Sequence, residues 1–227
     1  MVVGGGLLAS AFADVFARRS DIVIFASGVS NSQERDAAAF KRERNLLETV
    51  QSENRKIVYF STCSLFDPEL EHAPYVVHKR EMEALVRQAS RYAIFRLPQI
   101  VGKTPNAKTL TNFIHTKILL GERFDVWRHA KRNLIDVSDV ALIAKFLLNN
   151  EHFENQTANI ACPTSTSIVE LIKTLELILG QHAHYCLVDA GGSYEIDTEL
   201  AARVAMQVGI RFDESYAERV MRKYYGS

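Results

Sequence analysis

Short runs rich in β-branched residues alternate along this chain with longer segments whose apolar residues recur at helical spacing. Strands of this length separated by helices predict a parallel sheet with helices on both faces, which is a doubly wound α/β fold. The pattern predicts strands at Met1–Val3, Asp21–Ala26, Lys56–Phe60, Tyr92–Leu97, Asn133–Val137, Ala158–Ala161 and His184–Val188. It predicts helices at Leu7–Arg18, Gln33–Ser52, Tyr75–Gln88, Leu110–Leu120, Ser138–Asn149 and Ser167–Leu179, the last opened by a Ser167/Glu170 capping box.

A break near position 100 divides the predicted domain. Pro98, Gly102 and Pro105 interrupt the alternation there, and the pattern becomes less regular until about Asn133. We therefore expect a Rossmann-like nucleotide-binding core at 1–100 plus 133–150. Residues 101–132 plus 151–227 would form a small substrate-binding lobe, because 227 residues are too few for two full domains.

Charge and cysteine content restrict the partners and the compartment. The 27 lysines and arginines equal the 27 aspartates and glutamates, so no net field attracts nucleic acid or an anionic membrane. The three cysteines have no paired spacing, which favours a reducing compartment, and we expect the protein in the cytoplasm.

The apolar N-terminal run lacks a preceding basic residue and is interrupted by Asp14, unlike a secretion signal. His182, His184 and Cys186 could share one strand face, but without an evident fourth ligand we predict no metal site.

The N-terminal glycines fit the pattern G-x-G-x-x-A. Gly4, Gly6 and Ala9 stand between a predicted strand and a predicted helix, where a backbone turn can approach a pyrophosphate at the helix N-terminus. The same triplet is also compatible with an ordinary tight turn.

Two further groups of residues carry chemistry. The strand at 56–60 runs into Ser61, Thr62 and Ser64, whose hydroxyls would either face a crevice or cap the following turn. Tyr75 and Lys79 lie four residues apart on the next helix and share one face. The ammonium could lower the pKa of the phenol and make it a proton relay, unless the two are an ordinary exposed pair. His78 falls on a different face, and we expect it to tolerate alanine.

The order of these motifs resembles one known family. The glycine turn, the Ser-Thr strand end and Pro74-Tyr75-x-x-x-Lys79 are followed by Phe95-Arg96-Leu97-Pro98 with Gly102, and then by Arg132-Asn133-Leu134-Ile135-Asp136-Val137-Ser138-Asp139-Val140. A tail follows in which Tyr194-Glu195-Ile196-Asp197 precedes a helix and Gly209. This succession is similar to the extended short-chain dehydrogenase/reductases, in their NAD-dependent epimerase/dehydratase branch, over nearly the whole chain.

The resemblance implies a role for each matching residue. Tyr75 would be the general acid/base on a sugar oxygen, Lys79 would tune it and hold the nicotinamide ribose, and Thr62 would share the substrate oxygen. Arg132 would grip the substrate diphosphate, although it could equally be a solvated charge. The cofactor would be NAD or NADP. The implied cofactor-binding residues are Gly4, Gly6, Leu7, Leu8, Ala26, Ser27, Ser61, Tyr75, Lys79 and Pro98, and the implied substrate-binding residues are Ser64 and Arg132.

The chain departs from the family in its first half. Relatives carry two further strands and a helix where this chain passes directly through Arg19 and Ser20, and the lost segment normally supplies an acid for the adenosine ribose. No acid stands at a matching strand end. Arg18, Arg19 or Arg35 could meet a 2′-phosphate instead, or they could be surface arginines.

The strand end also departs from the sugar dehydratases. Relatives that dehydrate sugars carry Thr-Asp-Glu, where this chain has Thr62, Cys63 and Ser64. The resemblance thus implies an NAD(P)-dependent epimerase or keto-reductase acting on a nucleotide-activated sugar, for surface polysaccharide assembly, with 4,6-dehydration disfavoured. Cys63 is read as a small buried residue or a reactive thiol. The alternative is a non-redox binding or regulatory member of the fold. Relatives pair through the two helices matching 33–52 and 75–88, so we expect a homodimer.

Overall fold

The computed structural model describes residues 1–16, 19–51, 55–150 and 152–226. Its main sheet has five parallel strands in the order β1-β2-β3-β4-β9. These strands are β1 (Val2–Val3), β2 (Ile22–Phe25), β3 (Lys56–Thr62), β4 (Tyr92–Leu97) and β9 (Gln156–Asn159). The predicted parallel α/β fold is confirmed, and β1 forms one edge of the sheet.

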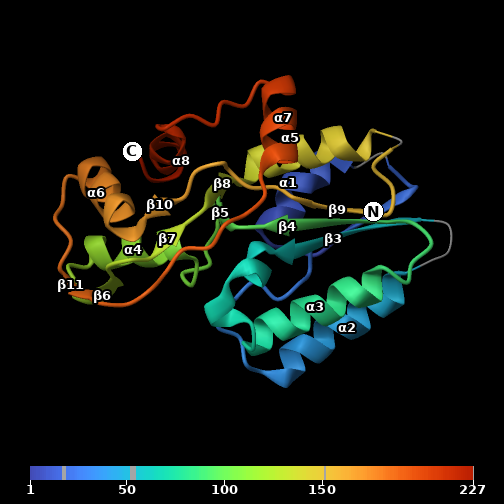
Figure 1. The fold of residues 1–227 in the computed structure, drawn as a ribbon, viewed down its shortest axis with the longest axis horizontal. Helices are drawn as coiled ribbons and strands as arrows, with labels where there is room; N and C mark the ends of the chain where they lie inside the picture. Colours follow the sequence, from blue (N-terminus) through green and yellow to red (C-terminus); the bar gives the residue numbers. More distant parts are fainter. Residues whose placement is uncertain (17–18, 52–54, 151, 227) are drawn as a thin grey trace.

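Helices cover both faces of this sheet (Figure 1). Helices α1 (Leu7–Phe16) and α5 (Val137–Leu148) lie on one face, and α7 (Glu199–Gln207) packs against both α5 and β9. Helices α2 (Ala37–Val50) and α3 (Pro74–Val86) lie on the other face. The two layers follow from the alternation of side chains along a strand.

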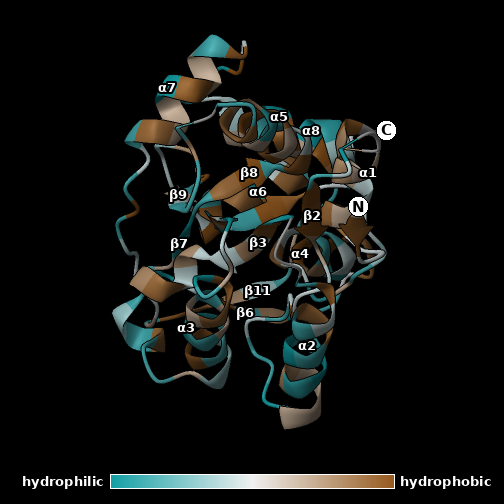
Figure 2. Cartoon of the chain, turned by 90° about the vertical axis from the view of Figure 1, so that its right-hand side faces the viewer, coloured by the Kyte–Doolittle hydropathy of each residue, from teal (hydrophilic) through white to brown (hydrophobic). Residues whose placement is uncertain are grey.

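Alternate residues of each central strand enter two separate cores. In β2, Ile22 and Ile24 join the cluster under α1 and α5, while Val23 and Phe25 join the cluster under α2 and α3. The residues of β3 divide in the same way, and both strands are completely buried. Figure 2 shows the hydrophobic strands enclosed between helices of mixed hydropathy. A strand buried on both faces reads as a continuous apolar run, which is the pattern seen in the sequence.

Several strands and helices from the second half of the chain lie beside the main sheet rather than in it (Figure 1). Among them, β5 pairs with β8, β6 pairs with β11, and β7 pairs with β10. These strands and helices are β5 (Gln99–Val101), α4 (Leu110–Leu119), β6 (Phe124–Trp127), β7 (Lys131–Arg132), β8 (Leu134–Asp136), β10 (Thr166–Ser167), α6 (Ile168–Leu179), β11 (Tyr185–Val188) and α8 (Tyr216–Tyr225). Two 3₁₀ turns, η1 (Cys63–Phe66) and η2 (Pro68–Leu70), follow β3.

Two strands lie elsewhere than the sequence suggested. Strand β8 does not return to the main sheet but pairs with β5, while β9, which we expected in the lobe, forms the sheet edge beside β4. The periodicity of a sequence indicates where a strand lies but not which strand it pairs with, so the pairing partners could not be predicted from it. The predicted capping box is confirmed, because Ser167 and Glu170 exchange both hydrogen bonds at the start of α6.

A buried carboxylate is one of the groups that attach the C-terminal helix to the core. Asp136 ends β8 and accepts hydrogen bonds from the Ser138 N–H at 2.7 Å, from Lys223 Nζ at 2.6 Å and from the Tyr224 hydroxyl at 2.7 Å. It therefore caps α5 and anchors α8 at the same time. Among the helices of the described residues, none is long and apolar enough to cross a membrane.

Candidate active site

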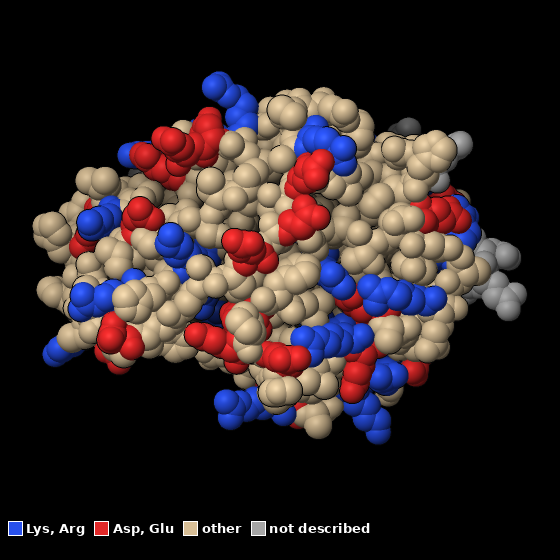
Figure 3. Space-filling model, viewed as in Figure 1, with Lys and Arg blue, Asp and Glu red and all other residues tan. Residues whose placement is uncertain are grey.

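A cavity of about 410 Å³ lies at the carboxyl ends of the sheet strands, which is where open α/β sheets bind ligands. Three cations, Arg42, Lys79 and Lys108, are among the described residues that line it, and no Asp or Glu is among them. The overall charge is balanced, and acidic and basic side chains intermix on the face seen in Figure 3. Because Lys79 is paired with Glu43 behind the wall, Arg42 and Lys108 are the cations in the described lining that would favour an anionic ligand in this cavity.

The glycine turn forms one wall of this cavity. Gly4 has φ +131°, and a Cβ there would lie 2.4 Å from the carbonyl oxygen of Ala26, so only glycine fits. Gly5 and Gly6 line the cavity, and a Cβ on either would meet nothing within 4 Å. Helix α1 begins directly afterwards at Leu7, and its N-terminal amides favour a negative group at this wall.

Thr62 and Tyr75 meet at the end of β3. The Thr62 hydroxyl oxygen accepts a hydrogen bond of 3.1 Å from the Ser64 N–H, so the capping interpretation is confirmed. The same side chain also lines the cavity beside Tyr75. Burial raises the pKa of the Tyr75 phenol, and hydrogen bonding with Thr62 opposes that rise. The phenol is therefore protonated at neutral pH, and the expectation of a lowered pKa is wrong.

Lys79 is buried, and its charge is already paired. Its Nζ donates to Glu43 Oε1 and to the Tyr59 hydroxyl, each at 3.0 Å. It also lies 5.8 Å from the centroid of the Tyr75 ring. Sequence reasoning placed Lys79 beside Tyr75 but missed the carboxylate that shares it.

Glu43 could have been recognised from its position in α2. Phe40, Glu43, Leu47 and Val50 recur at helical spacing, and Glu43 and Leu47 are the residues of this helix that are completely buried. A carboxylate on the apolar stripe of a helix must find partners, because an unpaired buried charge is very costly.

His78 contradicts the expectation that it lies away from the pair. It is 5% exposed, its Nε2 is 3.0 Å from Glu43 Oε2, and its ring stacks on Phe40 with centroids 4.5 Å apart. An ionised carboxylate can only accept hydrogen bonds, so Nε2 of His78 is the protonated nitrogen that donates to Glu43. Position 78 is three residues from Tyr75, and helix geometry turns both toward the interior because α2 covers this side of α3.

Cys63 is a buried residue rather than an activated thiol. Burial raises its pKa to about 12, so it stays protonated at neutral pH, and the buried alternative is the one the structure shows. Ser64 lines the cavity as predicted, and it lies beside Tyr194, a half-buried residue from the segment before α7. Tyr194 lines the cavity as well and was not among the predicted site residues.

Most of the predicted site residues come together. Those that line the cavity are Gly6, Leu7, Leu8, Ala26, Ser27, Ser61, Thr62, Ser64, Tyr75, Lys79 and Pro98. Gly4 belongs to the glycine turn but does not line the cavity itself. Arg132 does not line the cavity either. The Arg132 Nη1 donates to the carbonyl oxygens of Lys131 at 2.8 Å and Gly192 at 3.2 Å, which ties down the segment that carries Tyr194.

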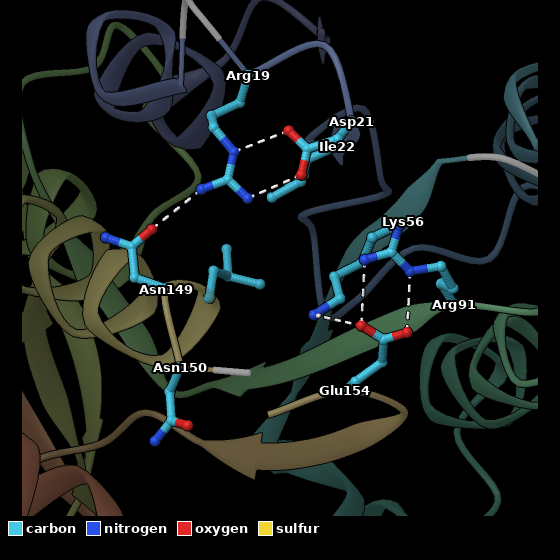
Figure 4. A pocket seen from close by; sticks show the side chains of 9 residues that line it. Arg19, Asp21, Ile22, Lys56, Arg91, Asn149, Asn150 and Glu154 are labelled. Atoms are coloured by element: carbon cyan, nitrogen blue, oxygen red, sulfur yellow. Dashed lines mark hydrogen bonds and ion pairs between the residues drawn. The ribbon is translucent and has the colours of Figure 1, made fainter. Parts of the chain in front are cut away.

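The arginines considered for a 2′-phosphate are not at this cavity. Arg35 is exposed and outside the lining, and Arg18 falls outside the described residues. Ser52, the predicted end of the helix from Gln33, also falls outside them. Arg19 makes two bonds of 2.8 Å to Asp21 at the opposite end of the sheet. There it lines a second hollow, of about 530 Å³, whose charges pair with one another (Figure 4).

The charged residues of that second hollow form ion pairs that join separate segments of the fold. Arg91 makes a two-pronged contact with Glu154 at 2.9 and 3.2 Å, and the Lys56 ammonium lies 3.5 Å from the same carboxylate. These pairs join the starts of β3 and β4 to the segment before β9 (Figure 4). Because the charges satisfy one another, they are not available to bind a ligand in this larger hollow.

The fold and the first cavity define a doubly wound α/β domain with its ligand site at the carboxyl ends of the strands. The family model described as the NAD dependent epimerase/dehydratase family matches residues 3–161, and the chain belongs to this family. A search of curated protein sequences found no significant match.

Solved structures share the fold at low identity. The UDP-N-acetylglucosamine 4-epimerase from Bacillus cereus is 18% identical with a TM-score of 0.70, over 99% of this chain and 98% of that one. RMD from Pseudomonas aeruginosa, complexed with NADPH, is 18% identical with a TM-score of 0.64, over 93% and 81%. The dTDP-glucose 4,6-dehydratase from Bacillus anthracis, in complex with NAD, is 14% identical with a TM-score of 0.67, over 96% and 76%.

Proposed function

We propose that this chain is an NAD(P)-dependent epimerase or keto-reductase that acts on one carbon of a nucleotide-activated sugar. The observation that carries the proposal is the meeting of Thr62, Tyr75 and Lys79 in one anion-favouring cavity beside the glycine turn. Family membership and the sugar-nucleotide enzymes among the structural neighbours support it.

The residues present fit a dinucleotide. The turn at Gly4–Gly6 opens a helix N-terminus into the cavity, and no carboxylate among the described lining residues would repel phosphate. Leu7, Leu8 and Pro98 supply apolar walls, and Lys79 would hold a ribose hydroxyl. When bound, such a cofactor supplies hydride acceptance or donation.

The protein would supply the proton. A buried, protonated Tyr75 donates to a keto oxygen as it becomes an alkoxide, while the Thr62 hydroxyl holds the same oxygen. Epimerisation would need the reverse transfer as well, with Tyr75 first taking the proton of a sugar hydroxyl. Cys63 and Ser64 offer no carboxylate for elimination, so we disfavour 4,6-dehydration for this chain.

A binding or regulatory protein that has lost its dinucleotide is the second candidate. The observation that favours it is that β1, with only Val2–Val3, forms an edge of the sheet and pairs with β2 alone among the described strands. Titration of NADH and NADPH, followed by nicotinamide fluorescence, separates the two. Saturable binding supports the enzyme, whereas no change up to millimolar cofactor with folded protein supports the second candidate.

The wider assignments remain predictions. These are the division into a core and a substrate lobe, surface polysaccharide assembly as the pathway, a cytoplasmic location, Arg132 as a substrate ligand and a homodimer through α2 and α3. Light scattering at micromolar concentration tests the dimer. A nucleotide sugar that co-purifies, identified by mass spectrometry, tests the substrate class.

A further inference from the structure

One completely buried carboxylate joins three elements of the fold next to the candidate active site. Glu43, on α2, is 0% exposed and accepts hydrogen bonds from four groups. The donors are the Val29 N–H at 2.6 Å, the Tyr59 hydroxyl at 2.6 Å, His78 Nε2 at 3.0 Å and Lys79 Nζ at 3.0 Å. Val29 belongs to the loop after β2, Tyr59 to β3, and the other two to α3.

The chain leaves room for this cluster at Gly28. A Cβ on Gly28 would lie 2.8 Å from Lys79 Nζ and 2.9 Å from Glu43 Oε1. Any other residue at position 28 would therefore have to displace the ammonium, the carboxylate or both. Since Gly28 also lines the cavity, the ion pair lies directly behind the cavity wall.

The ammonium of Lys79 depends on this carboxylate. Burial lowers the pKa of Lys79, and Glu43 is the strongest influence in the other direction. The other titratable groups around this pair, among the described residues, are His78 on Glu43, the Tyr59 and Tyr75 rings that Lys79 approaches, and Glu83 on α3. Glu83 is itself engaged by Arg96, at 2.8 and 2.7 Å, and by Arg87.

The carboxylate is equally dependent on its neighbours. Burial would raise the pKa of Glu43, but Lys79 and the hydrogen bonds from His78, Tyr59 and Val29 lower it to about 2. Breaking a buried pair by removing one partner leaves the other charge uncompensated, whereas removing both partners is often neutral.

We propose that Glu43 is a positioning residue, which holds the Lys79 side chain in its charged form and ties it to the Val29 loop and to β3. Glu43 itself touches neither cofactor nor substrate in this proposal. Its effect on cofactor binding rests on the proposed function and passes through Lys79.

The first test measures stability and needs no cofactor. In Glu43→Gln, Lys79 stays buried without its carboxylate, so its folded-state pKa falls further below the value of about 10.4 expected in the unfolded chain. The unfolded state then binds more protons, and stability rises with pH across this window. We expect the unfolding equilibrium constant to fall with pH between 6 and 9, by up to about tenfold per pH unit.

The reciprocal variant gives the opposite slope. In Lys79→Met the buried Glu43 loses its cation, so its folded-state pKa rises, and stability falls as pH increases through the window above the unfolded value of about 4.3. The double variant Glu43→Gln/Lys79→Met has neither charge and should show neither slope. If Glu43→Gln does not fold, the difference in pH slope between Lys79→Met and the double variant still tests whether Glu43 and Lys79 depend on each other. Equal slopes in the single and double variants would overturn the proposal.

The second test measures cofactor affinity. Wild-type affinity for NADH should stay level between pH 6 and 9. In Glu43→Gln it should weaken by about tenfold over this range as Lys79 loses its proton, the loss expected for one charged hydrogen bond. A level Glu43→Gln profile alongside wild-type binding would overturn the proposal. If wild-type protein binds no NADH but the stability slopes appear, the proposed function fails and the role of Glu43 stands.

Discussion

Gly4 passes directly against the backbone of Ala26, so closely that a Cβ on Gly4 would lie 2.4 Å from the Ala26 carbonyl oxygen. The contact brings the glycine turn onto the end of β2, where the Ala26 N–H also donates to the Val3 carbonyl oxygen at 2.8 Å. Gly4→Ala would add both this clash and a disfavoured φ of +131°. We expect a loss of about 2–4 kcal/mol in the free energy of unfolding, measured by urea titration.

Gly5 provides the matched control for this change. A Cβ on Gly5 would meet nothing within 4 Å, and its φ is not in the left-handed region. Gly5→Ala should therefore keep stability within about 0.5 kcal/mol of the wild type. Equal losses from the two variants would show that the contact with Ala26 does not constrain Gly4.

The Asp136 carboxylate should contribute more to the free energy of unfolding than an exposed carboxylate with a bond of similar length. Asp136 is 4% exposed and bonds Lys223, Tyr224 and the Ser138 N–H, whereas Asp189 is exposed and its carboxylate contacts His129 at 2.8 Å. We expect Asp136→Ala to cost about 2–4 kcal/mol, from a lost helix cap and stranded partners.

Asp189→Ala should cost under about 0.5 kcal/mol, since exposed ion pairs contribute little. Thermal unfolding of both variants, with limited proteolysis at α8, checks the comparison. If α8 is cleaved no faster in Asp136→Ala than in the wild type, Asp136 does not anchor that helix.

His78 should not tolerate alanine. The change removes the donor to Glu43 Oε2 and the ring stacked on Phe40, and it opens a cavity in a site that is 5% exposed. We expect a loss of about 2 kcal/mol or more in unfolding free energy. His72→Ala, at an exposed position before α3, serves as the control and should be neutral. A neutral His78→Ala would restore the view that this residue faces away from the pair.

The sequence predicted the order of the main elements because each carries its own periodicity. Strand β4 matches its predicted bounds Tyr92–Leu97, and α6 differs from its prediction by one residue at its start. The pairing of strands could not be predicted in this way, because the placement of β8 and β9 depends on contacts between segments far apart in the chain. Short strands such as β7, with two residues, carry too few positions to show a period.

The same division holds for the active site. Thr62, Tyr75 and Lys79 could be proposed from the sequence because their local spacing, on one strand and one helix, follows the order of motifs in the family it resembles. Glu43 and Tyr194 reach the site from α2 and from the segment before α7, so only the folded chain brings them there. The pKa of Tyr75 was misjudged because burial raises it most and the Glu43 charge raises it further, and neither effect can be read from the local spacing.

The raised pKa of Tyr75 predicts the pH dependence of ketone reduction. A general acid works only while protonated, so activity falls as pH rises through its pKa. Burial places that pKa above the ordinary value of about 10. The kcat/KM for reduction should therefore stay level from pH 6 to 9. A decline centred below pH 8 that disappears in Tyr75→Phe would show that the phenol ionises more easily than its burial implies.

Removing the Tyr75 hydroxyl should abolish turnover while leaving the fold intact. Tyr75 is 7% exposed at the start of α3, and its ring packs beside Val29 and Val76, contacts that phenylalanine keeps. A positioned general acid contributes about 10²–10⁴-fold in rate, so Tyr75→Phe should lose at least about 100-fold in kcat. Affinity for the cofactor should change little, because the nucleotide contacts proposed here lie mainly on the glycine turn and Lys79.

The assay uses the native sugar nucleotide, identified from co-purified material, with Tyr92→Phe as the control for loss of a phenol outside the cavity. Lys79→Met should lower kcat and weaken cofactor binding together, because it changes the ribose contact as well as the charge near the phenol. If Tyr75→Phe kept more than about a tenth of the wild-type kcat, the loss would be smaller than general acid catalysis supplies. Tyr194, whose phenol also lines the cavity, would then be the next residue to replace.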